Sequence, residues 1–472
     1  MAERNGAPCA AWFADAAGAR LVNGADAVFD RVETDSRSAG PGALFIALKG
    51  ERSDGHDFVR MAADAGASAV LVSARWYVAA GTSLPDGLRA AVIVADDTLG
   101  ALQKAATAWR KRFPSLLRFG VTGSAGKTST KELLASILEH DRPTVKNPGN
   151  LNSDIGLAAS LFLVRQAHRA AVFEMGINYP GEMDALTAMY EPDCALVTNI
   201  GTAHIGVLGG TRDAIAREKK KIASRFSGTQ TLVVPEDDDF RDRLLENLPG
   251  RGFTFGPRSD DGFEGARDLG VDGWVIRYRG TECRLHLPGA HNLRNALGAI
   301  RAATLYGAEA GDVAAGLDNV RPLDGRTSII RGDWTIVDDC YNANAESMLA
   351  AIEFCDSLPV SGRRIYVMGA MRELGAESDA AHRRIGQAAA VSAAGRSASS
   401  VLVFYGEETR PAFETARSAA CASSLLYFEN YGDLEKAVVP LASAGDLILV
   451  KASRTLALER LTGKLALAMG VT

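Results

Sequence analysis

Residues 121–132, VTGSAGKTSTKE, combine glycines with a Gly-Lys-Thr sequence, the composition of a loop that binds the phosphates of a nucleotide. The commonest such loop, G-x-x-x-x-G-K-[ST], would need its first glycine at Val121, whereas this chain has Gly123. A turn that only joins a strand to a helix would explain Gly123 and Gly126. It would not explain Lys127 at the start of a helix, where a cation opposes the helix dipole unless an anion is bound nearby. We therefore expect a nucleotide site with unusual spacing.

The flanking sequence predicts the elements that position this loop. LLRFGVTG (116–123) is an apolar run typical of a buried strand, and a helix is expected to begin near Lys127. Backbone N–H groups at a helix N-terminus lack internal partners and carry partial positive charge, so they bind phosphate oxygens. Lys127 would reach the terminal phosphates, and the Thr128 hydroxyl would bind Mg²⁺. The residues expected to contact the nucleotide are Gly123, Ser124, Ala125, Gly126, Lys127, Thr128 and Ser129.

Two polar residues follow neighbouring apolar runs and are candidate metal ligands. Glu174 lies in AAVFEMG (170–176), and His204 lies in the glycine-rich stretch TNIGTAHIGVLGG (198–210). A single glutamate at a strand end is usually solvated, and a single loop histidine is usually structural. Beside a phosphate loop, however, the loops that follow parallel strands line the ligand crevice. We therefore expect Glu174 to bind Mg²⁺ with Thr128, and His204 to be a candidate ligand of a second ion.

The chain as a whole alternates short apolar runs with helical patterns, which predicts α/β architecture with mainly parallel sheets. Breaks near residue 98 and at VRPLDGR (320–326) divide it into three parts. The predicted strands, besides 116–123, are 43–48, 68–73, 91–96, 170–176, 194–201, 231–236, 334–339, 364–369, 400–406 and 446–453. An Ala-rich segment at 292–307 is predicted to be helical, and 388–400 a helix end followed by a loop.

Composition narrows the class of protein. The 472 residues are 47% hydrophobic and 23% charged, as in soluble globular proteins of about three domains. The net charge of −5 argues against a general nucleic-acid binder. Six scattered cysteines without a CxxC pair favour reduced thiols over a zinc site or a disulfide framework. With no signal peptide and no apolar run of about 18 residues, we expect a cytoplasmic protein.

Together, these motifs and several others resemble the Mur ligase superfamily over nearly the entire chain. GSAGKT (123–128) matches the family's G-x-x-G-K-T loop, which accounts for the unusual spacing. VDDCYNANAESM (337–348) is the most diagnostic segment, because its Asp-x-Tyr-Asn-Ala-Asn form is similar to the branch of the family that ligates D-alanyl-D-alanine. Other matching segments are 34–58, 146–158, 173–183, 198–210, 288–299, 324–330, 371–386 and 449–454.

The resemblance implies an ATP-dependent ligase of peptidoglycan synthesis that joins D-alanyl-D-alanine to UDP-N-acetylmuramoyl-tripeptide through an acyl phosphate. It implies a UDP-muramoyl-peptide-binding α/β domain at 1–98, a central parallel-sheet phosphate-loop ATPase domain at 99–322, and a C-terminal Rossmann-like ligase domain at 323–472. ATP, two Mg²⁺ ions and a monomeric chain are implied as well. The third peptide residue, lysine or diaminopimelate, and the tolerance for other dipeptides are left open.

The resemblance also implies roles for individual residues. Lys127, Lys219 and His204 would be catalytic, and Lys219 would be carbamylated by CO₂, which gives it a carboxylate-like end that holds metal. The implied metal ligands are Thr128, Glu174, His204 and Lys219. Asn292 and Asn295 would lie near the adenine, Arg326 near the phosphates, and Asp339 near the ribose. The implied substrate-binding residues are Ser36, Arg37, Asn150, Asn152, Asn342, Asn344, Lys451 and Ser453.

Some positions depart from the family pattern. Lys220 and Lys221 replace a Gly-Glu pair and bring extra charge beside Lys219, although such a lysine run by itself indicates a solvated helix face. Ala370 replaces an aspartate in Gly-Asp-Met, and Ala345 replaces a proline in Asn-Pro.

Other functions remain open at this stage. A sister ligase that adds the third peptide residue is opposed by the Tyr-Asn-Ala-Asn sequence at 341–344, and a folylpolyglutamate synthase by the DSR…DGHDF segment at 35–58. A nucleotide-binding module without ligase activity is compatible with Ala370 and Lys221.

Overall fold

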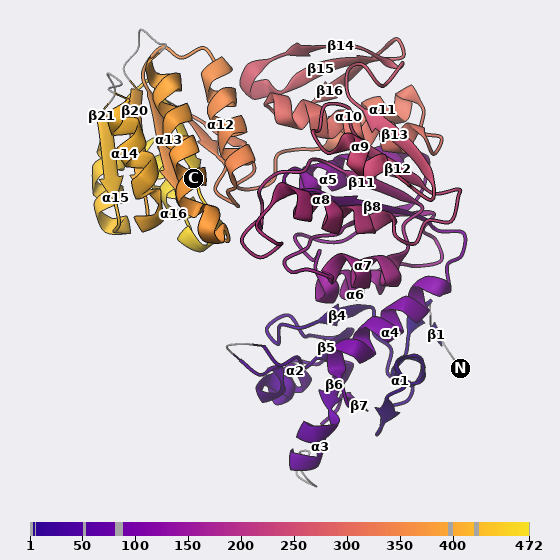
Figure 1. Cartoon of the computed structure of the whole chain (residues 1–472). Coiled ribbons are helices and arrows are strands. Elements are labelled where there is room, and N and C mark those ends of the chain that lie inside the picture. Colours follow the sequence, from indigo (N-terminus) through magenta and orange to yellow (C-terminus); the bar gives the residue numbers. More distant parts are fainter. Residues whose placement is uncertain are drawn as a thin grey trace.

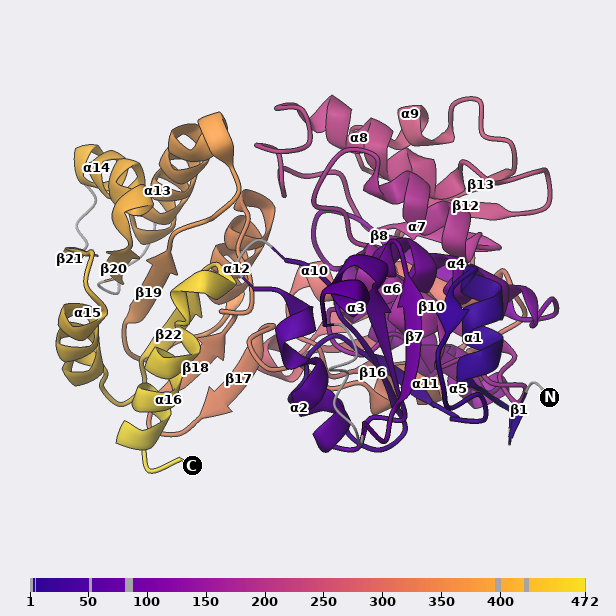
Figure 2. The same ribbon diagram turned by 90° about the horizontal axis from the view of Figure 1, so that it is seen from below.

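The computed structural model describes residues 3–4, 6–50, 53–80, 88–394, 400–419 and 424–471. The architecture is α/β with largely parallel sheets, as the sequence predicts (Figures 1 and 2). Three large sheets follow one another along the chain, and each predicted apolar run forms one of their strands. Most of these strands are buried along their whole length, because parallel sheets are covered by helices on both faces. The sequence did not predict the remaining strands of these sheets, which are β3 Arg20–Leu21, β4 Arg31–Glu33, β9 Thr144–Lys146, β13 Arg251–Phe255, β17 Ser328–Arg331 and β21 Ser424–Phe428.

The N-terminal sheet has the strand order β3-β7-β6-β5-β4, in which only β3 is antiparallel. Its strands are β3 Arg20–Leu21, β4 Arg31–Glu33, β5 Ala43–Ile46, β6 Ala69–Ser73 and β7 Ala91–Ala95. The same region contains α1 Ala10–Ala17, α2 Val59–Asp64, α3 Ala74–Ala80 and the short pair β1 Glu3–Arg4 and β2 Ala7–Pro8.

The central sheet is parallel throughout, with the order β13-β12-β11-β8-β10-β9. Its strands are β8 Leu117–Thr122, β9 Thr144–Lys146, β10 Ala170–Glu174, β11 Cys194–Val197, β12 Thr231–Pro235 and β13 Arg251–Phe255. Because β8 lies between β10 and β11, the glycine loop, Glu174 and the 198–210 loop meet at one edge of the sheet.

The helices of this region are α4 Thr98–Lys111, α5 Lys127–Asp141, α6 Asp154–Leu161, α7 Glu182–Tyr190, α8 Arg212–Lys220, α9 Arg241–Leu245, α10 Ala290–Thr304 and α11 Ala310–Asn319. The helix expected at 292–307 is α10, which begins and ends slightly earlier than predicted.

A three-stranded antiparallel sheet was not expected from the sequence. It consists of β14 Phe263–Asp268, β15 Trp274–Tyr278 and β16 Thr281–Leu285, and β16 packs against α11. Arg279 and Gly280 join β15 to β16 with φ angles of 46° and 76°. Two successive positive φ angles are typical of a tight hairpin turn, so Arg279-Gly280 was the available sequence signal.

The C-terminal sheet has the order β17-β18-β22-β19-β20-β21, with only β17 antiparallel. Its strands are β17 Ser328–Arg331, β18 Thr335–Asp338, β19 Arg364–Gly369, β20 Ser400–Tyr405, β21 Ser424–Phe428 and β22 Leu447–Lys451. Its helices are α12 Ala345–Ser357, α13 Ser378–Ala394, α14 Arg410–Ser418, α15 Tyr431–Val438 and α16 Glu459–Ala468. The loop predicted after α13 falls at 395–399, outside the described residues.

The connections between the three parts are short. Helix α4 starts directly after β7 and packs against both α1 and α6, and residues 320–327 lead from α11 to β17. The boundaries at 98 and 322 stay predictions. The C-terminal part lies beside the central part, and its helix α12 contacts α10 (Figure 1). No helix in the described ranges is long and apolar enough to cross a membrane.

Helix α5, which carries the glycine loop at its N-terminus, is held by α10 and α11. Gly316 of α11 lies against the α5 backbone, and a Cβ atom at this position would come within 2.4 Å of the Ile137 Cα atom. The Ser136 hydroxyl donates a hydrogen bond to the Gly316 carbonyl oxygen at 2.8 Å. The close approach therefore fixes the helix that presents the loop.

We expect Gly316→Ala to destabilise the protein by about 1–3 kcal/mol, because the added methyl group would force α11 away from α5. Gly311→Ala is the matched control, since the space around Gly311 in the same helix is open and alanine favours helix. Thermal unfolding followed by circular dichroism would compare the two variants. Equal melting temperatures would contradict the packing argument.

Candidate active site

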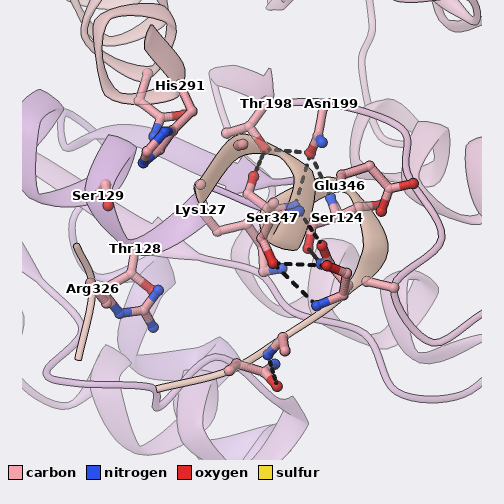
Figure 3. A pocket seen from close by; sticks show the side chains of 18 of the residues that line it. Ser124, Lys127, Thr128, Ser129, Thr198, Asn199, His291, Arg326, Glu346 and Ser347 are labelled. Atoms are coloured by element: carbon pink, nitrogen blue, oxygen red, sulfur yellow. Dashed lines mark hydrogen bonds between the residues drawn. The ribbon is translucent and has the colours of Figure 1, made fainter. Parts of the chain in front are cut away.

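A cavity of about 910 Å³ is lined by both the central and the C-terminal parts of the chain (Figure 3). Its wall is formed by the glycine loop, the segments after β10 and β11, the start of α10, and C-terminal segments around 325–327, 339–347 and 451–455. The predicted site residues on this wall are Ser124, Ala125, Gly126, Lys127, Thr128, Ser129, Asn150, Asn152, Glu174, His204, Asn292, Asn295, Arg326, Asp339, Asn342, Asn344, Lys451 and Ser453.

The glycine loop has a conformation that only glycine fits at two positions. Gly123 has φ 147°, and a Cβ atom there would lie 1.8 Å from the Thr198 Oγ1 atom. Gly126, the N-cap residue of α5, has φ 79°, and its Cβ would lie 2.3 Å from the Asn295 Oδ1 atom. With glycine as the cap, the N–H groups in the first turn of α5 have no side-chain acceptor at the cap position and face the cavity. The loop is thus built to bind an anion.

Asn199 holds the loop from the neighbouring strand, and sequence reasoning missed it. Its Oδ1 atom accepts hydrogen bonds from the N–H groups of Ser124 (3.1 Å) and Ala125 (2.8 Å), as Figure 3 shows. The Thr198 hydroxyl donates to the Ala125 carbonyl oxygen at 2.5 Å. The position of Thr198 and Asn199 directly after β11, next to the loop strand β8, was the signal that could have identified them. Because Asn199 already occupies the N–H donors of Ser124 and Ala125, the donors left for an incoming phosphate are the N–H groups of the first turn of α5.

Two lysines donate to one carbonyl oxygen behind the loop. The Nζ atoms of Lys127 and Lys219 lie 2.7 Å and 3.0 Å from the Gly123 oxygen. Burial, followed by the nearby charge of Lys127, holds the pKa of Lys219 well below its usual range. Burial also lowers the pKa of Lys127, with a smaller contribution from Arg326. Lys219 is 1% exposed and lies beneath the loop, so its neutral amine is the favoured form.

The neighbouring lysines point away from Lys219. The Lys220 amine donates to the carbonyl oxygens of Arg243 and Glu246, and the Lys221 amine pairs with Asp184 and Glu218. The extra charge at these departures from the family pattern is therefore directed to other partners.

Glu174 and Thr128 lie together, as the sequence suggests. The Thr128 hydroxyl donates to Glu174 Oε2 and the Asn152 amide to Oε1, both at 2.6 Å. The Glu174 carboxylate is 2% exposed, and Asn147 bonds to both the N–H and the carbonyl group of Glu174. Lys131, completely buried, donates to the backbone carbonyl oxygen of Asn147 at 2.8 Å and so holds the loop that carries Asn147, Asn150 and Asn152. A hydroxyl and a carboxylate oxygen at a phosphate loop are the donor types that Mg²⁺ prefers.

His204 has a different partner from the one its predicted role requires. It has φ 60°, and its Nδ1 atom lies 2.6 Å from Glu373 Oε2, across the cavity in the C-terminal part. Within the described residues, no group of three or more His, Cys, Asp or Glu side chains is arranged to hold a metal ion. The role of His204 as a metal ligand stays a prediction.

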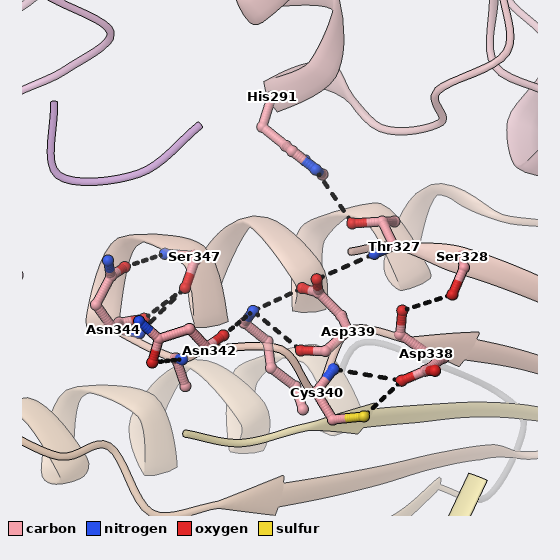
Figure 4. Close-up of polar contacts among 11 residues, drawn as sticks. His291, Thr327, Ser328, Asp338, Asp339, Cys340, Asn342, Asn344 and Ser347 are labelled. Carbon is pink, nitrogen blue, oxygen red and sulfur yellow. Dashed lines mark hydrogen bonds and ion pairs between the residues drawn. The ribbon is translucent and has the colours of Figure 1, made fainter. Parts of the chain in front are cut away.

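The start of α10 and the C-terminal part form the far wall. The Asn292 amide donates to the Pro288 carbonyl oxygen (2.8 Å), and the Asn295 amide donates to Asn292 Oδ1 (3.2 Å). The Arg326 guanidinium lies 4.0 Å from the centre of the Tyr341 ring. Beside them, burial lowers the pKa of His291, whose Nε2 atom is 3.4 Å from the Thr327 hydroxyl (Figure 4).

An ion pair organises the C-terminal wall. The Lys451 amine lies 2.6 Å from Asp339 Oδ2 and also donates to the Asn342 carbonyl oxygen at 3.0 Å. Asp339 Oδ1 accepts from the Thr327 N–H group at 3.0 Å, and Ser453 Oγ accepts from Arg372 N–H at 2.9 Å. These side chains are therefore fixed before any ligand is considered, and their individual roles stay predictions.

Ser36 and Arg37 are not brought to this cavity. Among the described residues the wall leaves out both, because Ser36 is buried near Met61 and Arg37 is exposed and paired with Asp35 at 2.5 Å. The arginine pairing lowers the pKa of Asp35 to about 2. Gly123 and Lys219 lie behind the wall, as described above.

The two C-terminal departures leave the local structure intact. Ala345 is the first residue of α12, a position where proline is favourable but not required. Ala370 follows β19 and is completely buried, its N–H donating to Tyr405 and its carbonyl oxygen accepting from the Ser453 N–H group.

Comparison with known proteins supports one family. Residues 28–110 match the description "Mur ligase family, catalytic domain", 121–303 match "Mur ligase middle domain", and 325–454 match "Mur ligase, glutamate ligase domain". The chain is 40% identical to a UDP-N-acetylmuramoyl-tripeptide–D-alanyl-D-alanine ligase of Treponema pallidum, over 92% of this chain and 93% of that protein. It is 34% identical to the protein of the same name from Bacillus subtilis, over 92% of each.

Solved structures agree with this similarity. A crystal structure of MurF from Acinetobacter baumannii has a TM-score of 0.83 at 30% identity and covers 97% of this chain and 98% of its own. MurF ligase from Thermotoga maritima, solved in complex with ADP, has a TM-score of 0.75 at 25% identity, covering 93% and 98%.

We expect Lys127→Ala to fold normally but to lose ATP-dependent turnover by about a hundredfold or more, because a cation that meets transferring phosphate charge is removed. Lys104→Ala, on the exposed surface of α4, is the matched control. ADP release in a coupled assay, with circular dichroism to verify folding, measures the effect. Undiminished ADP release by the Lys127 variant would contradict the assignment.

Proposed function

The chain belongs to the Mur ligase family, and from that premise we propose that it joins D-alanyl-D-alanine to UDP-N-acetylmuramoyl-tripeptide, converting ATP to ADP and phosphate. The product is the UDP-N-acetylmuramoyl-pentapeptide precursor of peptidoglycan. The observation that carries this proposal is the phosphate loop facing the Asp-x-Tyr-Asn-Ala-Asn segment across one cavity. The names of the relatives, which match along nearly their full length, support the same substrates.

The reaction needs ATP because a carboxylate does not accept an amine directly at neutral pH. Transfer of the γ-phosphoryl group to the terminal carboxylate of the tripeptide gives an acyl phosphate. The amine of D-alanyl-D-alanine then attacks the acyl carbon, and inorganic phosphate leaves. Lys127 and the N–H groups of α5 would bind the phosphate oxygens and stabilise charge as it develops.

Thr128 and Glu174 would hold a Mg²⁺ ion, and His204 together with a modified Lys219 would hold a second. The buried hydroxyl–carboxylate pair at 2.6 Å supports the first of these sites. Bound Mg²⁺ would neutralise charge on the phosphate oxygens. In this scheme Asn292, Asn295, Arg326 and Asp339 bind the rest of the nucleotide.

The three parts divide the substrates among them. Residues 1–98 would bind the UDP-muramoyl peptide through Ser36 and Arg37, helped by Asn150 and Asn152. Residues 99–322 would bind ATP, and residues 323–472 would present the dipeptide through Asn342, Asn344, Lys451 and Ser453. We further propose that the chain acts as a monomer.

Lys219 is proposed to carry a carbamate. A neutral lysine amine attacks CO₂, a C–N bond forms, and one proton is released. The depressed pKa and complete burial of Lys219 favour the neutral amine that this step needs. The carbamate would place negative charge near Lys127 in place of a second cation.

ADP release tests the proposed function. It should require both UDP-N-acetylmuramoyl-tripeptide and D-alanyl-D-alanine, because the acyl phosphate forms on one and is consumed by the other. The assay should use both the lysine-containing and the diaminopimelate-containing tripeptides. A non-catalytic module would respond to neither substrate, and a sister ligase would not need the dipeptide; either result would refute the proposal.

The carbamate has its own test. Lys219→Ala should lose activity by about a hundredfold, and short carboxylic acids should restore part of it by supplying the missing carboxylate. Lys221→Ala, whose side chain faces Asp184 and Glu218, should retain near-normal activity. Failure of rescue, combined with wild-type activity that is indifferent to removal of dissolved CO₂, would count against the modification.

A further inference from the structure

Asn344 uses the two ends of its side-chain amide for two different partners. Its Oδ1 atom accepts from the Ser347 N–H group at 2.9 Å and caps the N-terminus of α12 (Figure 4). Its Nδ2 atom donates to the Ser124 carbonyl oxygen at 3.3 Å. The first bond is local to the C-terminal part, whereas the second crosses the cavity to the glycine loop.

The peptide unit between Ser124 and Ala125 is consequently held at both ends. Asn344 donates to its carbonyl oxygen, and Asn199 accepts from its N–H group at 2.8 Å. A peptide unit is planar, so fixing both ends fixes its rotation and thereby the direction of the residues that follow. Asn199 belongs to the central part, and Asn344 supplies the second contact only when the C-terminal part is docked.

Neighbouring contacts show that the first turn of α12 fits closely against the central part. Glu346 Oε2 accepts from the Thr202 hydroxyl at 3.0 Å. A Cβ atom at Gly201 would lie 2.6 Å from the Glu346 carboxyl carbon, so Glu346 packs directly on the backbone of the central part. Asn344 is 8% exposed in this interface, which shields its bond to Ser124 from solvent.

We propose that Asn344 is a positioning residue that couples docking of the C-terminal part to the conformation of the phosphate loop. Both ends of its side-chain amide are hydrogen-bonded to the protein itself, so this role acts through Ser124 and is separate from the substrate contact that stays predicted for Asn344. The loop would reach its competent geometry only with the dipeptide-presenting part in place. This inference rests on the proposed function, because it assigns the coupling to the ligase reaction.

The chemistry of asparagine allows the two contacts to be separated. Asn344→Ser keeps an acceptor that caps helices about as well as asparagine but removes the donor to Ser124. Asn344→Asp keeps the acceptor and places a carboxylate against the Ser124 carbonyl oxygen. Tyr366→Phe, the stability control, removes the hydrogen bond from the Tyr366 hydroxyl to Asp356 Oδ1 (2.6 Å), which lies within the C-terminal part and off the cavity wall.

The test compares kcat for ADP release, melting temperature and the radius of gyration in the presence of ADP, measured by small-angle X-ray scattering. We expect Asn344→Ser to reduce kcat about tenfold, the size of one lost hydrogen bond, with an unchanged melting temperature. Asn344→Asp should reduce kcat further and enlarge the radius of gyration. Tyr366→Phe should lower the melting temperature and leave kcat near the wild-type value, because it removes a hydrogen bond of a buried side chain away from the cavity.

Two outcomes overturn the inference. One is wild-type kcat and radius of gyration in both Asn344 variants. The other is a kcat that falls in step with melting temperature in all three variants, which indicates a structural role only. If the wild-type protein itself releases no ADP in response to its two substrates, the proposed function has failed, and the scattering comparison alone then decides whether Asn344 holds the two parts together.

Discussion

The site depends on the hydrogen bonds that fix the glycine loop, because this loop spans fewer residues than the common phosphate loop and gains its shape from neighbours. Asn199 binds two of its N–H groups, Thr198 fills the space beside Gly123, and Asn295 does the same beside Gly126. These neighbours come from the segment after β11, which lies next to β8 in the sheet, and from α10, which packs against α5. The absence of a side chain at Gly123 and Gly126 is thus only half of the requirement. Other elements must also place the side chains that contact the loop.

The two lysines that donate to the Gly123 carbonyl oxygen destabilise the ligand-free protein. Two amines within hydrogen-bond distance of one carbonyl oxygen disfavour each other's charge, and Lys219 has lost almost all solvent. A buried lysine without a counter-ion destabilises a fold unless it is neutral or acquires a partner. In the proposed reaction this destabilisation is removed, since Lys127 binds phosphate oxygens and the Lys219 amine becomes an anionic carbamate beside it. Binding of phosphate and carbamylation of Lys219 would therefore both stabilise this pair of lysines.

The sequence predicts well what is local. The strand before the loop, the helix that starts at Lys127 and the contact between Thr128 and Glu174 follow from apolar runs and from adjacency of parallel strands. It does not predict contacts between distant positions: Asn344 and Ser124 are 220 residues apart, and no local pattern pairs them. The contact of His204 with Glu373 of the C-terminal part was likewise not expected, and the role of His204 as a metal ligand stays a prediction. The antiparallel sheet at 263–285 was missed because its strands carry many exposed charged residues and so lack the apolar runs that marked the others.

The absence of a side chain at Gly201 has a consequence for how the molecule evolves. The backbone at this position lies directly against the Glu346 side chain, where the two halves of the cavity meet. A side chain here would force the Glu346 carboxylate to move and would disturb its hydrogen bond with Thr202, while the backbone on either side could stay in place. Substitution at Gly201 can therefore alter the contact between the two halves without altering any group that handles ATP.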